Sequence, residues 1–188
     1  MITIKDIAHI QTGIYEKPVA FGEIFYVQAR HFDDNRQFLD TVTPELHFDK
    51  KLEKHFLQKG DVLVAAKGYD HFAVAYQDIA YPAVASSMFI VLRLQTPSLL
   101  PDFLAWFINH PKTQAVLSGS AKGTALPSLN KSDIGDLIIP IPPLEKQDLI
   151  LNIEKLRHQE LALKKQLETL KHAIIQETIF KHLEKNSV

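Results

Sequence analysis

Nine histidines, 22 acidic residues and several serines are the side chains of this sequence that could carry out chemistry. The histidines are scattered without metal-ligand spacing, and no H-E-x-x-H is present. No serine lies in a G-x-S-x-G elbow, and Asp33, Asp34 and Asn35 are typical of a turn rather than of a catalytic carboxylate pair. Neither phosphate-cradling glycine motif occurs, and there is no cysteine. The sequence therefore favours a protein without catalysis, metal or cofactor.

Basic and aromatic side chains beside predicted loops are candidates of a second kind. Lys and Arg contact phosphate, while side chains that reach groove edges read bases. The strongest candidate is Lys67, which follows a predicted strand and precedes Gly68, as in a loop that reaches a groove. A solvated surface role explains each candidate equally well. Thr124, Ser128 and Asn130 could also contact phosphate, but helix entry and turn capping explain them equally well. The full set of these basic and aromatic candidates is Lys17, Arg30, Lys67, Tyr69, His71, Lys122 and Lys131.

The charge of the chain limits this hypothesis. Its formal net charge is −1, whereas strong nucleic-acid binders often carry a basic excess. Residues 1–143 hold 13 Lys+Arg against 15 Asp+Glu, and residues 144–188 hold 8 against 7. Any DNA-binding surface must therefore be a local patch on a neutral body.

The elements that would position these residues fall in residues 1–143, which read as a mixed domain. Runs rich in β-formers predict strands, Pro82 argues against a central strand at its position, and glycines mark turns. Pro101 suits the first turn of a helix with one apolar face, and Pro111 breaks it before a second short helix at 112–117. The predicted strands are 21–32, 62–66, 71–78 and 85–95.

Residues 144–188 contain neither proline nor glycine and predict one long helix of about 58 Å over 145–183. Apolar residues recur there in steps of four and three, a heptad seam interrupted by Glu160. A helix folded back on the core is one reading, but a coiled-coil arm is favoured because the seam continues for about four heptads. The predicted dimerisation residues are Leu149, Ile153, Leu156, Leu163, Leu167, Leu170 and Ile174.

The proline-rich segment between the two regions predicts a stiff connection. In IPIPP, residues 139–143, each residue before a proline is pushed out of the helical region. Pro143 and Glu145 suit the start of a helix, the second through the helix dipole. We therefore predict an α+β protein with a mixed, mostly antiparallel β domain and short helices, followed by one long C-terminal coiled-coil helix.

Several short motifs of the sequence resemble those of a known protein family. IPIPPLEKQ at 139–147, preceded by LNKSDI at 129–134 and LQKGDVLVAAKG at 57–68, resembles type I restriction–modification specificity subunits. IKDIAHIQTG at 4–13 resembles the start of one of their target recognition domains. Each motif alone is weak, but their order and spacing are specific and cover nearly the whole chain.

The resemblance implies a division of labour. Such subunits carry two recognition domains, each reading half of a split DNA site, and two conserved helices that pair as an antiparallel coiled coil. Methylation and cleavage belong to partner subunits. Here residues 1–143 would be one target recognition domain and 144–188 one helix for dimerisation and spacing, a half-length form. The implied partners are double-stranded DNA, modification methyltransferase subunits, a restriction subunit and a second copy of the chain. The basic and aromatic candidates above would then be its DNA contacts, and the two copies would read a two-fold symmetric, interrupted site.

Two other functions stay open on the sequence alone. The chain could be a coiled-coil adaptor or assembly protein of the same fold that binds protein and not DNA, which the neutral charge favours. It could also be a fragment of a fused methyltransferase–nuclease. The N-terminus does not resemble a signal peptide, and no stretch approaches the roughly 18 apolar residues of a membrane span. A cytoplasmic location is therefore expected.

Overall fold

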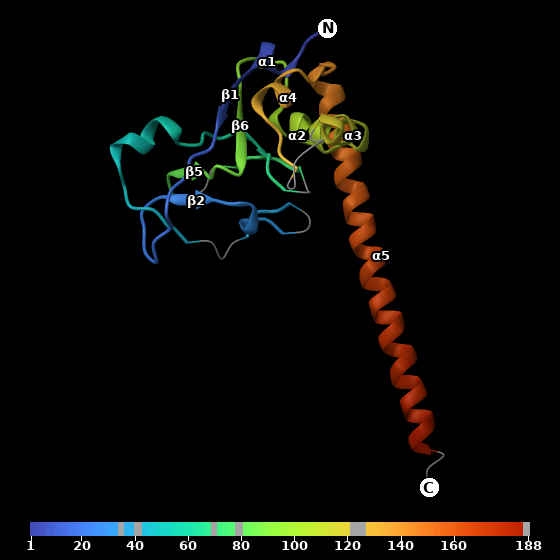
Figure 1. Ribbon diagram of the computed structural model, residues 1–188. Coiled ribbons are helices and arrows are strands. Elements are labelled where there is room, and N and C mark those ends of the chain that lie inside the picture. The colour runs from blue at the N-terminus through green and yellow to red at the C-terminus, as the bar shows by residue number, and fades with distance from the viewer. Residues whose placement is uncertain (34–35, 40–42, 69–70, 78–80, 121–126, 186–188) are drawn as a thin grey trace. The chain divides into compact units, whose positions relative to one another are not determined.

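The computed structural model describes the chain except for residues 34–35, 40–42, 69–70, 78–80, 121–126 and 186–188 (Figure 1). It divides into an N-terminal unit, Met1–Gln147, and a C-terminal unit, Asp148–Val188. The antiparallel sheet, the short helices and the long C-terminal helix confirm the predicted fold class. The predicted functional division, a recognition domain up to residue 143 and a dimerisation helix after it, stays a prediction.

A four-stranded antiparallel sheet forms the centre of the N-terminal unit. Its strand order is β1-β6-β3-β4, so β3 and β6 are the inner strands. Val62 of β3 lies opposite Leu92 of β6 and Ala75 of β4. All four residues of β3 are buried, which agrees with its continuous apolar sequence. The strands are β1 (Ala8–Thr12), β3 (Val62–Ala65), β4 (Ala73–Ala75) and β6 (Phe89–Leu94).

A second, two-stranded parallel sheet pairs β2 (Phe25–Val27) with β5 (Ala83–Ala85). Side chains alternate between its two faces, as the pleat requires. Phe25 and Val27 point into the larger core that includes Phe89, whereas Tyr26 packs with Leu46 in a smaller one. Both faces are therefore covered, and this sheet joins the two clusters of the core.

Three predicted strands were too long, and the one predicted at 71–78 contains only β4 within its described residues. The strand predicted at 21–32 is only β2, which is followed by a 3-10 helix, η1 (Ala29–His31). On the N-terminal side of β2, Gly22 is packed against the backbone of Leu46. A Cβ on Gly22 would lie 2.4 Å from the Leu46 nitrogen. The strand predicted at 85–95 begins at Phe89, whose amide donates to the Ser86 carbonyl in a turn at 2.9 Å.

The helices of the N-terminal unit are short. Pro101 occupies the first turn of α2, and the break at Pro111 is where the sequence predicts it. Within the described part of the chain, none of the helices has both the length and the apolarity to cross a membrane. The helices are α1 (Ile4–Ile7), η2 (Lys50–His55, 3-10), α2 (Pro101–Asn109), α3 (Pro111–Ser120) and α4 (Lys131–Gly135).

The start of the long helix belongs to the N-terminal unit, and Gln147 holds it there. This side chain is fully buried. Its Oε1 accepts from the Leu100 amide at 2.8 Å, and its Nε2 donates to the carbonyls of Ser98 at 2.8 Å and Pro142 at 2.7 Å. Upstream, the Ile139 amide donates to the carbonyl of Ile2 at 3.0 Å. The proline-rich segment is therefore anchored at both ends within this unit.

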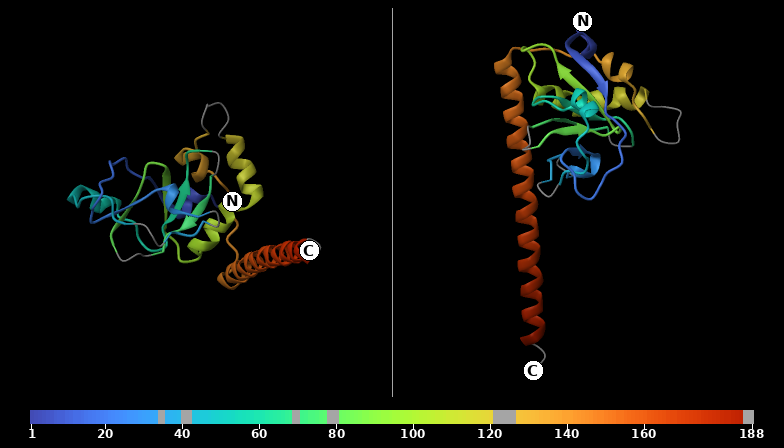
Figure 2. Two further views of the ribbon diagram at one scale, coloured as in Figure 1. Left: turned by 90° about the horizontal axis from the view of Figure 1, so that it is seen from below. Right: turned by 90° about the vertical axis from the view of Figure 1, so that its left-hand side faces the viewer.

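Helix α5 (Leu144–Lys185) runs for 42 residues, about 63 Å at the usual rise, and Figure 2 shows it unbroken. Ion pairs between residues three or four apart line it, such as Glu160 with Lys164 at 2.6 Å and Glu177 with Lys181 at 2.7 Å. The predicted seam side chains are 51–65% exposed, so an apolar stripe along the helix remains uncovered in the single chain: Leu149, Ile153, Leu156, Leu163, Leu167, Leu170 and Ile174.

Candidate nucleic-acid interface

Lys67 lies where the end of β3 meets a segment distant in sequence. The Leu129 amide donates to the Ala66 carbonyl at 2.8 Å, and Lys67 forms a β-bridge with Ser128. Gly68 has a φ of +111°, a left-handed conformation that glycine tolerates best, and its amide donates to a carbonyl of the same distant segment at 3.0 Å. The Lys67 side chain is exposed. Residues 127–131 are therefore held beside the Lys67 turn.

A third segment reaches the same end of β3. The Arg36 guanidinium carbon lies 6.0 Å from the centre of the Phe72 ring, within the range of a cation–π contact. The Phe72 carbonyl accepts from the Ala65 amide at 2.8 Å, which places this ring beside the last residue of β3. Phe32 packs edge-on against Phe72 at 5.7 Å between ring centres and fixes the segment that carries Arg36. We call Arg36, Lys67, Gly68, Ser128, Asn130 and Lys131 the convergent surface.

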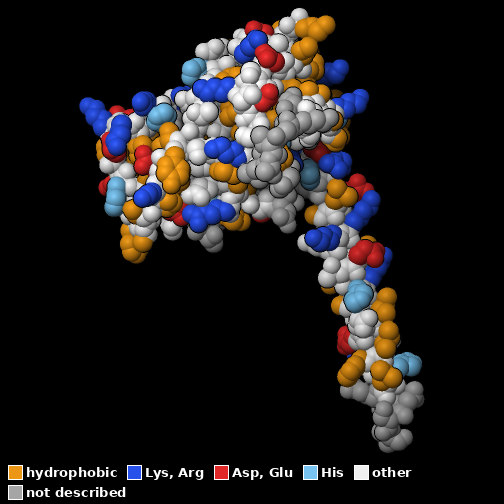
Figure 3. Space-filling view, in the orientation of Figure 1, with side chains coloured by type: hydrophobic (Ala, Val, Ile, Leu, Met, Phe, Trp, Pro, Cys, Tyr) orange, Lys and Arg blue, Asp and Glu red, His pale blue; other side chains and the backbone are white. Residues whose placement is uncertain are grey.

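Two acidic residues in the described segments that carry Arg36 and Lys131 accept local backbone hydrogen bonds. Asp33 accepts from a backbone amide of its own turn at 2.7 Å, and Asp133 accepts from the Asn130 amide at 2.7 Å. The side chains of Lys67 and Lys131 are exposed. Elsewhere on the visible face of the N-terminal unit, Lys and Arg side chains lie among acidic and apolar ones (Figure 3). The convergent surface thus offers cations to a phosphate backbone without requiring a basic body.

Asn130 has the capping role that the sequence also allowed. Its Oδ1 accepts from the amides of Ser132 at 2.8 Å and Asp133 at 3.0 Å, which satisfies the N-terminus of α4. Lys131 is the first residue of that helix. Because Asn130 is the cap, helix α4 begins at Lys131, whose side chain is exposed.

Of the remaining candidates, the structure describes Lys17, Arg30 and His71. Lys17 is exposed in the connection between β1 and β2. Arg30 donates to both carboxylate oxygens of Glu45 at 2.8 Å, so a phosphate would have to compete with a two-pronged ion pair. Tyr69 and Lys122, together with Thr124, lie outside the described residues.

His71 requires a correction, because its side chain is only 3% exposed. One ring nitrogen, Nδ1, lies 3.1 Å from the Ala65 carbonyl oxygen, so the imidazole bridges the two strands of the hairpin. A DNA contact needs a side chain at the surface, and His71 is built into the interior instead. The sequence showed only its proximity to Gly68, which does not distinguish inward from outward.

Side-chain amides fasten the strand that returns from this hairpin. At the last residue of α2, Asn109 donates through Nδ2 to the Ala73 carbonyl at 2.7 Å and accepts through Oδ1 from the Ala73 amide at 2.8 Å. The Nε2 of Gln114 donates to the His71 carbonyl at 2.8 Å and to the Ile108 carbonyl at 2.7 Å. Sequence reasoning missed both amides and also Arg36, although the position of Arg36 in a polar turn was a usable signal.

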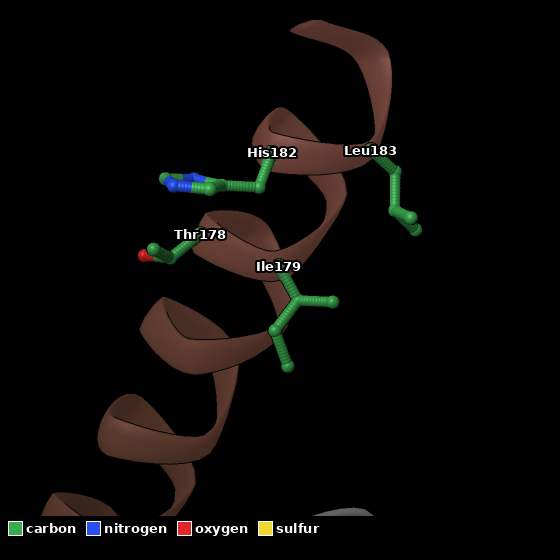
Figure 4. A pocket seen from close by; sticks show the side chains of 4 residues that line it. All are labelled: Thr178, Ile179, His182 and Leu183. Carbon is green, nitrogen blue, oxygen red and sulfur yellow. The ribbon is translucent and has the colours of Figure 1, made fainter. Parts of the chain in front are cut away.

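Other kinds of site find little support. Across the described residues, His, Cys, Asp and Glu do not gather in threes that could hold a metal. A shallow hollow lies between Thr178, Ile179, His182 and Leu183, which project from adjacent turns of α5 in Figure 4. A hollow bounded by one helix alone cannot enclose a small molecule, so we assign no ligand to it.

Comparison with known proteins gives a consistent result. Residues 1–172 match the model of a family described as the type I restriction modification DNA specificity domain. None of the curated proteins matches the chain. Two similar solved structures are the HsdS subunit from Thermoanaerobacter tengcongensis and the S subunit of a type I restriction-modification system from M. genitalium.

The likeness to these structures concerns the fold. The first has 19% identity and a TM-score of 0.59, with 87% of this chain and 38% of that chain covered. The second has 16% identity and a TM-score of 0.53, with 85% and 39% covered. The chain therefore spans about two fifths of the length of the proteins that it resembles.

Proposed function

The chain belongs to the type I restriction modification DNA specificity family, and on this premise we propose that it is a non-catalytic subunit that reads double-stranded DNA through the convergent surface. The observation that carries the proposal is the β-bridge between Lys67 and Ser128, which joins the Lys67 turn to the segment that leads into Lys131, about 60 residues further along the chain. Such a surface suits phosphate contact by the lysines, with the adjoining hairpin reaching a groove.

A second copy of the chain would complete the recognition unit. The family match covers one domain and most of one helix, and the seam of α5 is an uncovered apolar stripe. Glu160 favours an antiparallel pair: in a parallel pair in register, the two Glu160 carboxylates would face each other. Antiparallel pairing about the middle of the seam sets Glu160 against Leu163 of the partner subunit instead. The two domains would then read a split, symmetric site.

The chemistry would belong to other subunits. We propose that modification methyltransferase subunits dock on the paired chains, that a restriction subunit joins them, and that the assembly works in the cytoplasm. The chain itself would hold no cofactor and would contribute recognition and spacing.

A protein-binding adaptor is the second candidate, and the charge supports it. Residues 1–143 carry a net charge of −2, which opposes tight DNA binding by this unit alone. Co-purification from the native cell, followed by DNA titration of the purified complex, separates the two functions. A methyltransferase that accompanies the chain and a complex whose affinity falls steeply with salt support DNA recognition. A complex with no affinity for any duplex supports the adaptor.

Lys67→Ala tests the convergent surface. If Lys67 contacts phosphate, the reconstituted complex should bind all sequences more weakly, and the salt slope should become shallower by about one unit. If Lys67 contacts a guanine edge, the loss should be about 1–3 kcal/mol on the specific duplex and little on a scrambled one. Titrations of both duplexes at two salt concentrations distinguish these results.

The chain supplies a matched control at the other end of β3. Lys59 is also exposed, and it also precedes a glycine with positive φ, Gly60 at +89°. Lys59→Ala should leave affinity and salt slope unchanged. Equal behaviour of the two variants would remove the Lys67 turn from the interface.

A further inference from the structure

Strand β4 is an edge strand that completes its hydrogen bonding with side chains. In the four-stranded sheet it pairs only with β3. An edge strand exposes unpaired backbone groups, which proteins usually cover or block. Here the Asn109 amide donates to the Ala73 carbonyl at 2.7 Å and accepts from the Ala73 nitrogen at 2.8 Å. The side chain thereby reproduces the pair of bonds that a neighbouring antiparallel strand would form.

Gln114 extends this arrangement toward the hairpin tip. The Nε2 group of Gln114 donates one hydrogen bond to the His71 carbonyl at 2.8 Å and another to the Ile108 carbonyl at 2.7 Å. It therefore joins the first described residue after the tip to the end of α2. Residues 71 and 73 are held by three hydrogen bonds from the helix corner, while Lys67 stands on the other side of the tip.

We propose that Asn109 and Gln114 are positioning residues that determine the sequence selectivity of the Lys67 hairpin. This rests on the proposed function of the convergent surface. In this proposal, neither side-chain amide contacts DNA. They hold residues 71 and 73, and Phe72 between them accepts from the Ala65 amide at the end of β3, which precedes Lys67. Lys67 would then meet the groove in one position, and base readout depends on such placement more strongly than phosphate contact does.

Two isosteric substitutions test the pair. Gln114→Met keeps the length of the side chain and removes both donated hydrogen bonds. Asn109→Asp keeps the acceptor for the Ala73 amide but places a carboxylate against the Ala73 carbonyl. Gln95→Met is the control, because the Gln95 side chain is exposed just after β6 and its backbone amide, not its side chain, donates to the Ile7 carbonyl at 2.8 Å.

The measurement is binding by the complete complex reconstituted with methyltransferase. The wild-type complex first selects its site from a randomised duplex library, and each variant is then titrated on that duplex and on its scrambled form. Gln114→Met should lower the preference for the selected site roughly tenfold, about the size of one mismatched base pair. Affinity for the scrambled duplex and the salt slope should stay unchanged. Asn109→Asp should act in the same direction.

Three results would overturn the proposal. Equal losses on both duplexes would assign the amides to general stability, and melting of each variant complex would show that loss directly. If a folded Gln114→Met complex keeps its preference for the selected duplex, the amides do not position the Lys67 turn. A wild-type complex that selects no sequence would overturn the proposed function and this inference together. The other two results concern the variants alone and would leave the proposed function standing.

Discussion

Asp61→Ala is expected to destabilise the N-terminal unit by about 2–3 kcal/mol, because it removes a buried carboxylate and leaves the Arg93 guanidinium, whose side chain is 30% exposed, without its partner. Asp61 is 1% exposed, and its two carboxylate oxygens accept from the Arg93 guanidinium at 2.8 and 2.7 Å. Asp61 also accepts from the Gln58 amide at 2.8 Å, while Arg93 donates to the Phe56 carbonyl at 3.0 Å. The hydrogen bonds that Arg93 donates to Asp61 raise the pKa of Arg93. An arginine is charged even without such a partner, so the guanidinium stays charged when Asp61 is lost.

Thermal unfolding monitored by circular dichroism measures the effect. A loss of about 2–3 kcal/mol corresponds to a fall in Tm of roughly 4–12 °C for a unit of this size. Removing both charges in Asp61→Leu/Arg93→Met should be milder than Asp61→Ala, since no unpaired charge remains. Asp136→Ala is the exposed control: Asp136 pairs with Lys5 at 2.6 Å with side chains 60% and 59% exposed, and its loss should barely change Tm. Similar shifts for Asp61→Ala and Asp136→Ala would refute the buried-pair account.

Leu163→Asp is expected to weaken self-association of the full chain by at least 100-fold. The seam position would appear twice in a dimer, and each unpaired carboxylate on a buried seam costs several kcal/mol, where about 1.4 kcal/mol is a factor of ten in affinity. Leu167→Asp, one turn further along the same stripe, should act alike. Sedimentation equilibrium of wild type and variants over a range of concentrations gives the dissociation constants.

Leu161→Asp is the matched control for the seam. Leu161 is 50% exposed, close to the 65% of Leu163, and lies two residues away, which turns it to the opposite side of the helix. The same chemical change there should leave the dimer intact. If Leu161→Asp dissociates the dimer and Leu163→Asp does not, the pairing face is wrong. A wild-type chain that is monomeric at micromolar concentration would refute self-pairing itself.

The sequence predicted elements better than it predicted their contacts. The long helix, the break at Pro111 and the buried strand at 62–65 follow from local patterns of apolar residues and prolines. The lengths of β2 and β6 do not, because β-formers before them are held by segments distant in sequence. Gly22 shows the reason: its place against Leu46 is a tertiary contact that composition cannot reveal.

The candidate site was predictable only in part. A lysine before a glycine identified the Lys67 turn, but pairing of that turn with Ser128 depends on how the chain returns from α3. His71 looked equivalent to Lys67 in the sequence, and only the register of the hairpin places it inside. Gln147 was part of a recognisable motif, yet its three hydrogen bonds are a property of the folded unit.

The burial of Gln147 gives α5 two ends of unequal stability. A helix normally frays from both termini, where its backbone groups lack partners. At the start of α5, fraying would leave the Gln147 amide and the Leu100 nitrogen without their hydrogen bonds inside the N-terminal unit. The first turn therefore opens only when that unit opens with it, whereas the far end is free to open alone. Disorder in the isolated chain would consequently spread from Lys185 toward Asp148 and stop at the buried glutamine.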